Sequence, residues 1–549
     1  MIKIKHIRNH SSKALLACLM LSHFSCSDFL EVESKEQVSD ATLWQTTGNA
    51  DLFLNNVYTG IPGPFNTFDP GENFTDNAMN GVNGQTSRTL YANSVYTASN
   101  SPSVWGLYSS IRASNVFIEK AGASTLPDAW KKVRLAEARF VRAYYYMLLW
   151  TNYGGVPIIE DVLDQNEQGD AIFRARNTAE ETYQFIVSEC AAIANDLPET
   201  VEAGRASKGS ALALQGFCEL YYASPLYNPS NDKAKWLKAA QTSKKVIDQG
   251  KYTLFGNYET MLLEANNNNS EVIFAKQYLG GTGLGGGREG LQGPWIVGGI
   301  QHAYGGVNPT QELVDEYAMA NGLPITDPAS GYDPQQPYKN REKRFYQSVI
   351  YDGAFWLDKE MIMKQGVGSR NATDLSNTNE ATNTGYYLKK GLDPKYAVNG
   401  NHQLSSANFV IFRFAEVLLN YAEAQNEAVG PDASVYEAIN KVRLRSELPA
   451  LKAGLTQEQM RVAIHRERRV ELAFEEKRWY DLMRLKLAEK NLNGSLHAMV
   501  IEQSNGKWNY KVVPAPDGSR TFFAQKNYVF PIPQAAIDRN AKLTQNPNY

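Results

Sequence analysis

Two stretches of this sequence place apolar residues at helical spacing, and they constrain the fold more than any other feature. They lie between residues 104 and 250 and between residues 412 and 489. Residues three and four positions apart share one face of a helix, so this spacing predicts amphipathic helices that pack against one another. The expected helices span residues 41–59, 104–120, 128–151, 178–196, 207–223, 234–249, 310–320, 412–428, 433–446 and 456–489. We therefore predict a mainly α-helical fold.

The turns between the first helices are short, and their residues are typical of helix ends. Gly154 and Gly155, followed by Pro157, predict the end of one helix, and Ser207 is a suitable N-cap for another. Gly216 is small enough to let two helices approach closely. Helix pairs joined in this way resemble stacked hairpins of the tetratricopeptide kind, with an irregular period. We expect such TPR-like units in the first half of the chain.

The chain changes in character between and after the helical stretches. Residues 60–103 are dominated by Gly, Asn, Ser, Thr and Pro with interleaved aromatic residues, which predicts a long surface loop. Residues 271–275 are typical of a strand, and a hairpin is expected near 344–357. The tail after residue 490 is expected to be irregular. Long loops of this kind often carry function.

Residues 1–25 have the layout of a secretory signal. Four basic side chains and no acidic one flank a short apolar run at 14–21. That run is too short to span a bilayer, which takes about 20 apolar residues. Cys26 stands at the expected cleavage point, where a diacyl group on its sulfur would give stable anchoring. We predict cleavage before Cys26 and lipidation there, with an ordinary signal peptide as the alternative.

The expected organisation has three parts. It comprises a lipoprotein signal at 1–25, a helical region with TPR-like units at 26–250, and a C-terminal region at 251–549 that is loop-rich to 405, helical from 406 to 490 and irregular from 491 onward.

The net charge argues against nucleic acid as a partner. The formal charge is −3, and the first 25 residues contain four basic side chains and no acidic ones, so residues 26–549 carry −7. A mildly acidic chain does not favour nucleic acid as a partner.

Cys190 and Cys218 lie in helical patterns and are interpreted as small buried residues, with a disulfide as the less favoured alternative.

Motifs for catalysis or cofactor binding are weak. Gly281, Gly283 and Gly286 satisfy G-x-G-x-x-G, but no helix is expected to open directly on that loop, as a dinucleotide site requires. His465 and Glu471 share a helix at a spacing that does not suit zinc, and we expect the charged residues around them to form structural ion pairs. No serine or cysteine nucleophile signature is present, and a pair of glycosidase carboxylates cannot be recognised from sequence alone. We predict no cofactor and no metal.

Aromatic residues in loops remain as candidates for ligand contact. Flat rings stack on the apolar faces of sugars or grip peptide side chains, and they lose little entropy on binding. The alternative for each ring is that it packs a loop onto the helical body. We predict stacking by one or more of Trp295, Tyr304, Tyr91 and Tyr96, with Trp356 as a further loop aromatic and with Asp76, Asn77 and Arg288 orienting the ligand.

Several blocks of sequence together carry a resemblance to a known family. They are residues 27–31 after the expected lipidation site, 138–144 with 153–157, 416–424, 439–443, 467–475 with 478–484, and 543–549. In combination they resemble the SusD/RagB family of Bacteroidetes outer-membrane lipoproteins over nearly the whole chain after Cys26. There are two small departures: Glu476 replaces a usual Gly, and Asn548 stands where Gly is common.

The resemblance implies a non-catalytic protein on the cell surface. Such proteins are lipid-anchored in the outer membrane and lie as a hinged lid over a SusC-like TonB-dependent barrel. They capture a glycan and hand it to the barrel, with the helical body facing the barrel and the loop-rich part carrying the ligand. Ligand contacts vary within the family, so no binding residue is carried over. The alternatives are the same role for oligopeptides, a surface glycoside hydrolase, and a structural adhesin.

Overall fold

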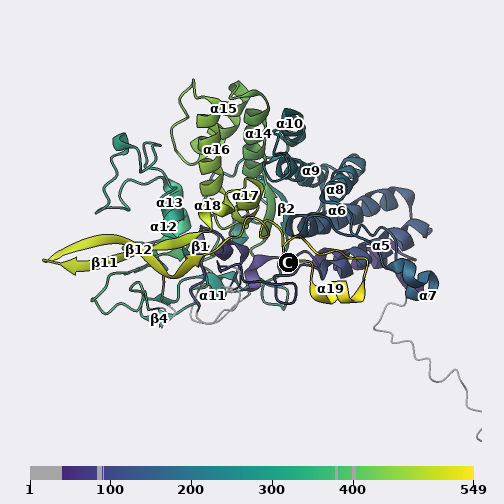
Figure 1. Cartoon of the computed structure of the whole chain (residues 1–549), viewed down its shortest axis with the longest axis horizontal. Coiled ribbons are helices and arrows are strands. Elements are labelled where there is room, and N and C mark those ends of the chain that lie inside the picture. Colours follow the sequence, from purple (N-terminus) through teal and green to yellow (C-terminus); the bar gives the residue numbers. More distant parts are fainter. Residues whose placement is uncertain (1–39, 68, 83–89, 91, 377–380, 398–403) are drawn as a thin grey trace, which may run out of the picture.

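The structure is a computed structural model that describes residues 40–67, 69–82, 90, 92–376, 381–397 and 404–549 (Figure 1). Helices make up one side of the molecule, and loops with short strands make up the other. The fold is mainly α, as predicted. Cys26 and Tyr91 lie outside the described residues, as does the expected signal segment. Among the described residues, no helix is both long enough and apolar enough to cross a bilayer.

The predicted N-terminal helices are confirmed with small differences at their ends, except that the single helix predicted over 41–59 is divided into two at residues 44–46. They are α2 Asp40–Leu43, α3 Thr47–Thr59, α5 Leu107–Ala123, α6 Asp128–Tyr153, α8 Ala179–Ile193, α9 Lys208–Ala223 and α10 Lys233–Asp248. Side-chain caps explain several starts: Thr178 and Ser207 each accept a hydrogen bond from the third residue of the helix that follows. From α5 to α10 each long helix packs on the next, in the hairpin arrangement of TPR-like units.

The second helical group completes the body. It contains α14 Phe414–Val429, α15 Ala433–Arg445 and α16 Gln457–Glu471, and α14 packs against α10. Apolar residues from α10, α14, α15 and α16 form a shared core. A larger core joins the N-terminal helices to α17 Arg478–Arg484 and the C-terminal tail, and it buries Cys190 and Cys218 as free thiols. The interpretation of both cysteines as small buried residues is therefore confirmed.

The single helix predicted over 456–489 is wrong. The chain leaves helical geometry after Glu471 and resumes it in α17 Arg478–Arg484 and α18 Ala488–Asn491. Phe474 and Glu476 adopt left-handed backbone, with φ of 63° and 61°. The backbone N–H of Phe474 donates to Glu72 at 3.0 Å, so a contact distant in sequence overrides the helical pattern. The same geometry explains why Gly is usual at position 476, because only Gly adopts it without strain.

The tail after residue 490 is not irregular. Its strands β11 Gly494–Ser504 and β12 Lys507–Arg520 form a long antiparallel hairpin that projects from the left of Figure 1. Asn505 and Gly506 turn the chain with φ of 52° and 72°. An Asn-Gly pair with both residues at positive φ is the favoured two-residue hairpin turn, so the sequence contained this signal. A short helix, α19 Gln534–Arg539, follows.

The remaining elements are short and lie mainly in the loop-rich part. They are η2 Pro64–Asn66, η3 Gly71–Phe74, β1 Ala78–Met79, α7 Gln165–Gln168, η4 Gly169–Ile172, η5 Glu264–Asn266, β2 Val272–Lys276, α11 Arg288–Gln292, β3 Ile296–Val297, β4 Ile300–Gln301, β5 Asn308–Pro309, α12 Gln311–Val314, η6 Pro328–Ser330, α13 Lys343–Ser348, β6 Val349–Ile350, β7 Phe355–Trp356, β8 Lys359–Glu360, β9 Tyr387–Leu388 and β10 Phe409–Arg413. The strands pair antiparallel in twos: β1 with β5, β2 with β10, β3 with β4, β6 with β9, and β7 with β8. The predicted strand at 271–275 is confirmed as β2. The hairpin expected near 344–357 lies later, at β7–β8.

Part of the predicted surface loop at 60–103 lies inside the molecule. Residues 75–82 are buried, because β1 pairs with β5 and because Asp76 and Asn77 contact arginines of α16 and α17. This segment is therefore a structural strap between the helical body and the loop-rich part.

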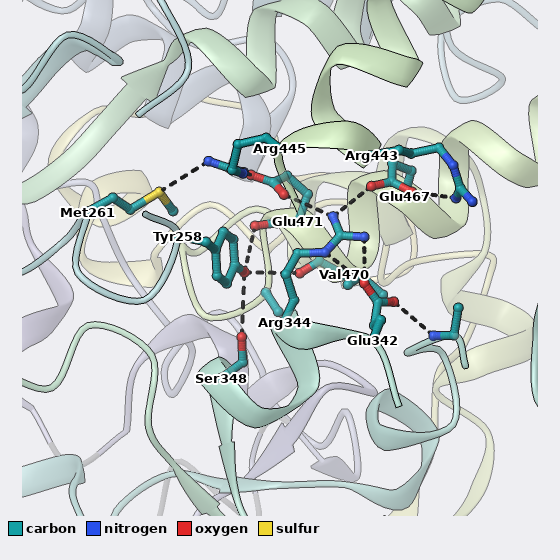
Figure 2. A network of polar contacts seen from close by, with 12 residues as sticks. Tyr258, Met261, Glu342, Arg344, Ser348, Arg443, Arg445, Glu467, Val470 and Glu471 are labelled. Atoms are coloured by element: carbon teal, nitrogen blue, oxygen red, sulfur yellow. Dashed lines mark hydrogen bonds and ion pairs between the residues drawn. The ribbon is translucent and has the colours of Figure 1, made fainter. Parts of the chain in front are cut away.

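Buried ion pairs join the loop-rich part to the helices, as expected for the charged residues of the 456–489 stretch. In Figure 2, Arg344 of α13 contacts Glu467 at 2.6 Å and Glu471 at 2.9 Å, both on α16. Arg413 extends the network to Glu471 at 2.7 Å. We call this the arginine network; its members are Glu271, Glu342, Arg344, Lys390, Arg413, Arg443, Arg445, Glu467, Glu471 and Glu475.

Candidate functional site

Trp295 stands at the start of a tight hairpin in the loop-rich part. Its carbonyl oxygen accepts a hydrogen bond from the backbone N–H of His302 at 2.8 Å, next to the pairing of β3 with β4. Gly298 and Gly299 make the turn with φ of 57° and 85°, the two positive values that this hairpin type requires. The turn fixes the position of Trp295 at the surface, and its side chain is half-buried.

Arg370 lies over the Trp295 ring. Its guanidinium carbon is 4.6 Å from the ring centroid, close enough for cation–π attraction. The next residue, Asn371, donates its side-chain amide to the carbonyl oxygen of Ile296 at 2.7 Å and so ties this loop to β3. Arg370 is exposed, and no carboxylate of the described chain forms an ion pair with it. A ring and a guanidinium are thus both presented at one surface.

A second hairpin, β7–β8, lies against the first. A methyl group built on Gly298 would be 3.1 Å from Cγ of Lys359, which places the two turns in contact. Phe355 is 67% exposed, whereas the neighbouring Trp356 is 5% exposed. Successive strand residues point to opposite faces, so turning one ring inward turns the other outward. The structure therefore places the predicted loop aromatic Trp356 in the core and presents Phe355, which the sequence analysis missed.

We call the surface formed by Trp295, Ile300, Lys359 and Arg370 the aromatic face. Phe355 points away from it, because its neighbour Trp356 is the residue that pairs with Lys359. Ile300 adds apolar area, since it is 59% exposed at the tip of the first hairpin. Flat and apolar groups beside two cationic side chains suit a ligand that has both apolar faces and hydrogen-bonding groups. Tyr304, also predicted, is half-buried after the hairpin, and its backbone N–H donates to Gly290 at 2.9 Å.

Asp76 and Asn77 lie away from the aromatic face. Asp76 pairs with Arg478 at 2.7 Å and with Arg469 at 3.0 Å. Burial alone would raise the pKa of this carboxyl, but the two arginines outweigh it and hold the pKa well below its usual range. Asn77 donates to Glu72 at 2.8 Å and accepts from Arg469. The structure corrects the expectation that a surface loop presents these two side chains to a ligand.

Arg288 and Tyr96 are also internal. Arg288 is 4% exposed, lies 4.9 Å from the centroid of the Phe65 ring and donates to the carbonyl oxygen of Phe474. Tyr96 is 2% exposed and packs edge-on against Phe530. Arg288 begins the short helix α11 and Tyr96 lies in a loop, but loops in this protein cover one another, and residue type alone does not reveal which side chains are outermost. Of the predicted stacking residues, the structure leaves Trp295 and Tyr304 near the surface.

The charged clusters elsewhere in the described chain consist of ion pairs that stabilise the fold. The acidic side chains of the arginine network are each paired with arginine or lysine, and His465 lies 3.4 Å from Glu423, which Arg484 also contacts at 2.6 Å. In the described part of the chain, no group of three His, Cys, Asp or Glu side chains is placed to hold a metal ion. The glycine-rich loop at 280–287 precedes only the five-residue helix α11, which is too short for a dinucleotide fold.

Comparison with known proteins gives a consistent result over both halves of the chain. A family described as "SusD family" matches residues 270–549, and one described as "Starch-binding associating with outer membrane" matches residues 28–216. A SusD-like protein of Formosa agariphila, P2, is 26% identical over 80% of this chain and 79% of its own length. A SusD-like protein of Bacteroides ovatus is 25% identical over 69% of this chain and 64% of its own length.

Solved structures agree. A SusD-like protein of Bacteroides fragilis superposes with a TM-score of 0.78 at 27% identity, covering 93% of this chain and 99% of its own. A SusD-like carbohydrate-binding protein of the same species gives a TM-score of 0.76 at 26% identity, covering 92% and 100%. The predicted resemblance is confirmed, and the chain belongs to the SusD/RagB family.

Proposed function

We propose that this protein is a glycan-binding lipoprotein of the outer membrane that captures an oligosaccharide or polysaccharide on the cell surface. The observation that carries the proposal is the aromatic face, where the first of two adjoining hairpins holds Trp295 beside Arg370. Rigid rings at a surface stack on the apolar faces of sugar rings. The SusD-like carbohydrate-binding protein of Bacteroides fragilis, similar over nearly its whole length, supports this ligand class.

The proposed role is delivery without catalysis. Capture would be followed by transfer to a SusC-like TonB-dependent barrel, while a lipid on Cys26 keeps the protein at the membrane. The family described as associating with the outer membrane supports this location. Pairing with arginines or lysine makes the carboxylates of the arginine network unsuitable as a glycosidase pair, which needs one carboxylate free to attack and one free to donate a proton.

Affinity electrophoresis through gels that contain single polysaccharides tests the proposal. We expect at least one neutral or acidic glycan to retard the wild-type protein, and Trp295→Ala to lose about tenfold or more in affinity, since the stacked ring provides most of the contact. Phe523→Ala is the matched control, because Phe523 is 46% exposed and lies outside the aromatic face.

Three outcomes would contradict the proposal. Equal retardation of wild type and Trp295→Ala would remove this surface from the binding site. Binding of oligopeptides without any glycan would replace the ligand class. Release of soluble sugar from any retarding glycan would show an enzyme.

A further inference from the structure

A cavity of about 400 Å³ lies between the helical body and the loop-rich part, separate from the aromatic face. Its walls are the end of α3, the turn at 203–205, the end of β2 and the glycine-rich loop at 280–287. Small-molecule sites commonly occupy about 300–1,000 Å³ and lie where two parts of a fold meet. The cavity therefore has the size and the position of a ligand site.

The lining of this cavity is cationic. Arg205 and Lys276 both contribute to it, and of the described residues that line it none is acidic. Lys276 donates its ammonium protons to the backbone carbonyl oxygens of Ile61 and Thr59, and no carboxylate of the described chain forms an ion pair with it. Burial lowers the pKa of Lys276, and no acidic group offsets that effect. Lysines removed from water are normally paired, so this one lacks a counter-charge.

Arg205 does not add to the unpaired charge. Its guanidinium is 3.3 Å from Glu137, which also contacts Arg134 at 2.5 Å, and Arg134 pairs in addition with Asp51 at 2.8 Å. Two carboxylates therefore balance these two arginines. Lys390 shows the usual arrangement of a lysine in this protein: it is buried and pairs directly with Glu475 at 2.5 Å. Lys276 differs, because its ammonium contacts backbone carbonyl oxygens and no carboxylate of the described chain.

The other groups in the cavity wall suit a sugar. Tyr278 stacks on Phe65 with centroids 5.4 Å apart and planes at 22°, so its ring is held in a fixed orientation. Asn66 accepts from the backbone N–H of Gly287 at 2.7 Å and fixes the glycine-rich loop beside it. Gln277 adds amide groups to the same wall. A fixed ring with amides around it stacks on and hydrogen-bonds a saccharide ring.

We propose that this cavity binds the anionic group of an acidic saccharide, a uronate carboxylate or a sulfate ester, with Lys276 as its counter-charge and Tyr278 against the sugar ring. The inference rests on the proposed glycan-binding function and adds a second subsite that selects for charge. Lys276 makes the direct contact with the anionic group.

Isothermal titration of the full-length mature protein with oligosaccharides of equal length tests the proposal. The probes are an oligogalacturonate, a sulfated galacto-oligosaccharide and a neutral galacto-oligosaccharide. We expect one acidic probe to bind about tenfold or more tighter than the neutral one at low salt, and Lys276→Met to abolish that preference. The acidic probe that binds more tightly shows whether the cavity selects a carboxylate or a sulfate ester.

Lys235→Met is the matched control. Lys235 also donates to a backbone carbonyl oxygen, that of Tyr227 at 3.0 Å, and lies over a tyrosine ring, but it does not line the cavity. This variant should keep the preference, and Lys276→Arg should keep part of it because the charge remains.

The outcomes separate this inference from the proposed function. Equal affinity of Lys276→Met and wild type for the acidic probe overturns the inference. Binding of neutral glycans alone also overturns it and leaves the proposed function intact. Binding of no glycan by wild type overturns both. Tetraglutamate peptide bound as tightly as the acidic sugar overturns the saccharide assignment.

Discussion

Two groups of buried charge meet at the turn between α16 and α17, and they are built differently. Glu475 belongs to the arginine network: burial alone would raise its pKa, but Arg413 at 2.6 Å and Lys390 outweigh burial and hold the pKa at about 2. The next residue, Glu476, has no ion-pair partner among the described residues, and burial together with the neighbouring Glu72 raises its pKa to about 8. These adjacent glutamates therefore have pKa values shifted in opposite directions, because one is paired with cations and the other is not.

The second group uses carboxylates to hold backbone instead of cations. Glu476 accepts from the N–H of Gly71 at 2.7 Å, and Glu72 accepts from the N–H of Phe474 at 3.0 Å. Glu289 accepts from the N–H of Asp393 at 3.1 Å, and burial raises its pKa to about 7. We call Glu72, Glu289 and Glu476 the acid cluster. The comparison teaches that the paired charges of the arginine network hold the loop-rich part to the helices without depending on pH near neutrality. The packing of residues 71 and 72, just before the strap, depends instead on protonation.

The arginine network should be the larger contributor to stability. Arg413→Met removes the cation that contacts Glu271, Glu471 and Glu475, and it leaves these carboxylates buried without it. Breaking a buried pair in this way costs about 3–5 kcal/mol, which urea denaturation measures as a lower midpoint. Arg370→Met is the control, since it has no ion pair among the described residues, and its unfolding free energy should change little. A loss of unfolding free energy below about 1 kcal/mol for Arg413→Met would contradict the claim that the arginine network is the larger contributor to stability.

The acid cluster should make stability depend on pH. Glu476 has a folded pKa of about 8, above the value of an unfolded glutamate, so the folded protein binds the extra proton. Its contribution is therefore present at low pH and is lost as pH rises from about 4.5 to 8. Glu476→Gln cannot ionise, so its stability relative to wild type should increase across this window, by about 1.4 kcal/mol for each pH unit.

Urea denaturation of both proteins at pH 5, 6.5 and 8.5 measures this difference. The other members of the acid cluster titrate in both proteins, so the difference between them isolates position 476. A difference that stays constant across the three pH values would show that Glu476 is already ionised in the fold at pH 5.

Sequence predicts the parts of this protein that local rules determine. The long helices follow from apolar spacing and from caps such as Thr178 and Ser207, and these helices formed where expected. The break after Glu471 could not be predicted, because residues 472–477 contain neither Gly nor Pro and the backbone is held by Glu72, about 400 positions earlier in the chain. The β11–β12 hairpin could have been predicted from Asn505-Gly506.

The candidate site was predictable only in part. Trp295 follows a glycine-rich loop and could be recognised as a candidate, but its partner Arg370 comes from a different hairpin region and gives no signal in the sequence. Asp76 and Arg288 have the residue types of a binding site, yet the fold uses both internally. Whether a charge is paired depends on tertiary contacts, and for that reason Lys276 could not be distinguished from other lysines.

Exposure to water should remove nearly all of an ion pair's contribution to stability, and a pair on α15 tests this. Lys441 and Glu437 are one helical turn apart with 2.8 Å between their charged groups, and their side chains are 46% and 67% exposed. They carry the same charges as the buried pair of Lys390 and Glu475, but water screens them, so Lys441→Met should cost less than about 0.5 kcal/mol. Urea denaturation at low salt and in about 1 M salt should show that this small cost disappears when ions screen the pair. A cost above about 1 kcal/mol that survives high salt would mean that burial does not separate strong from weak pairs in this protein.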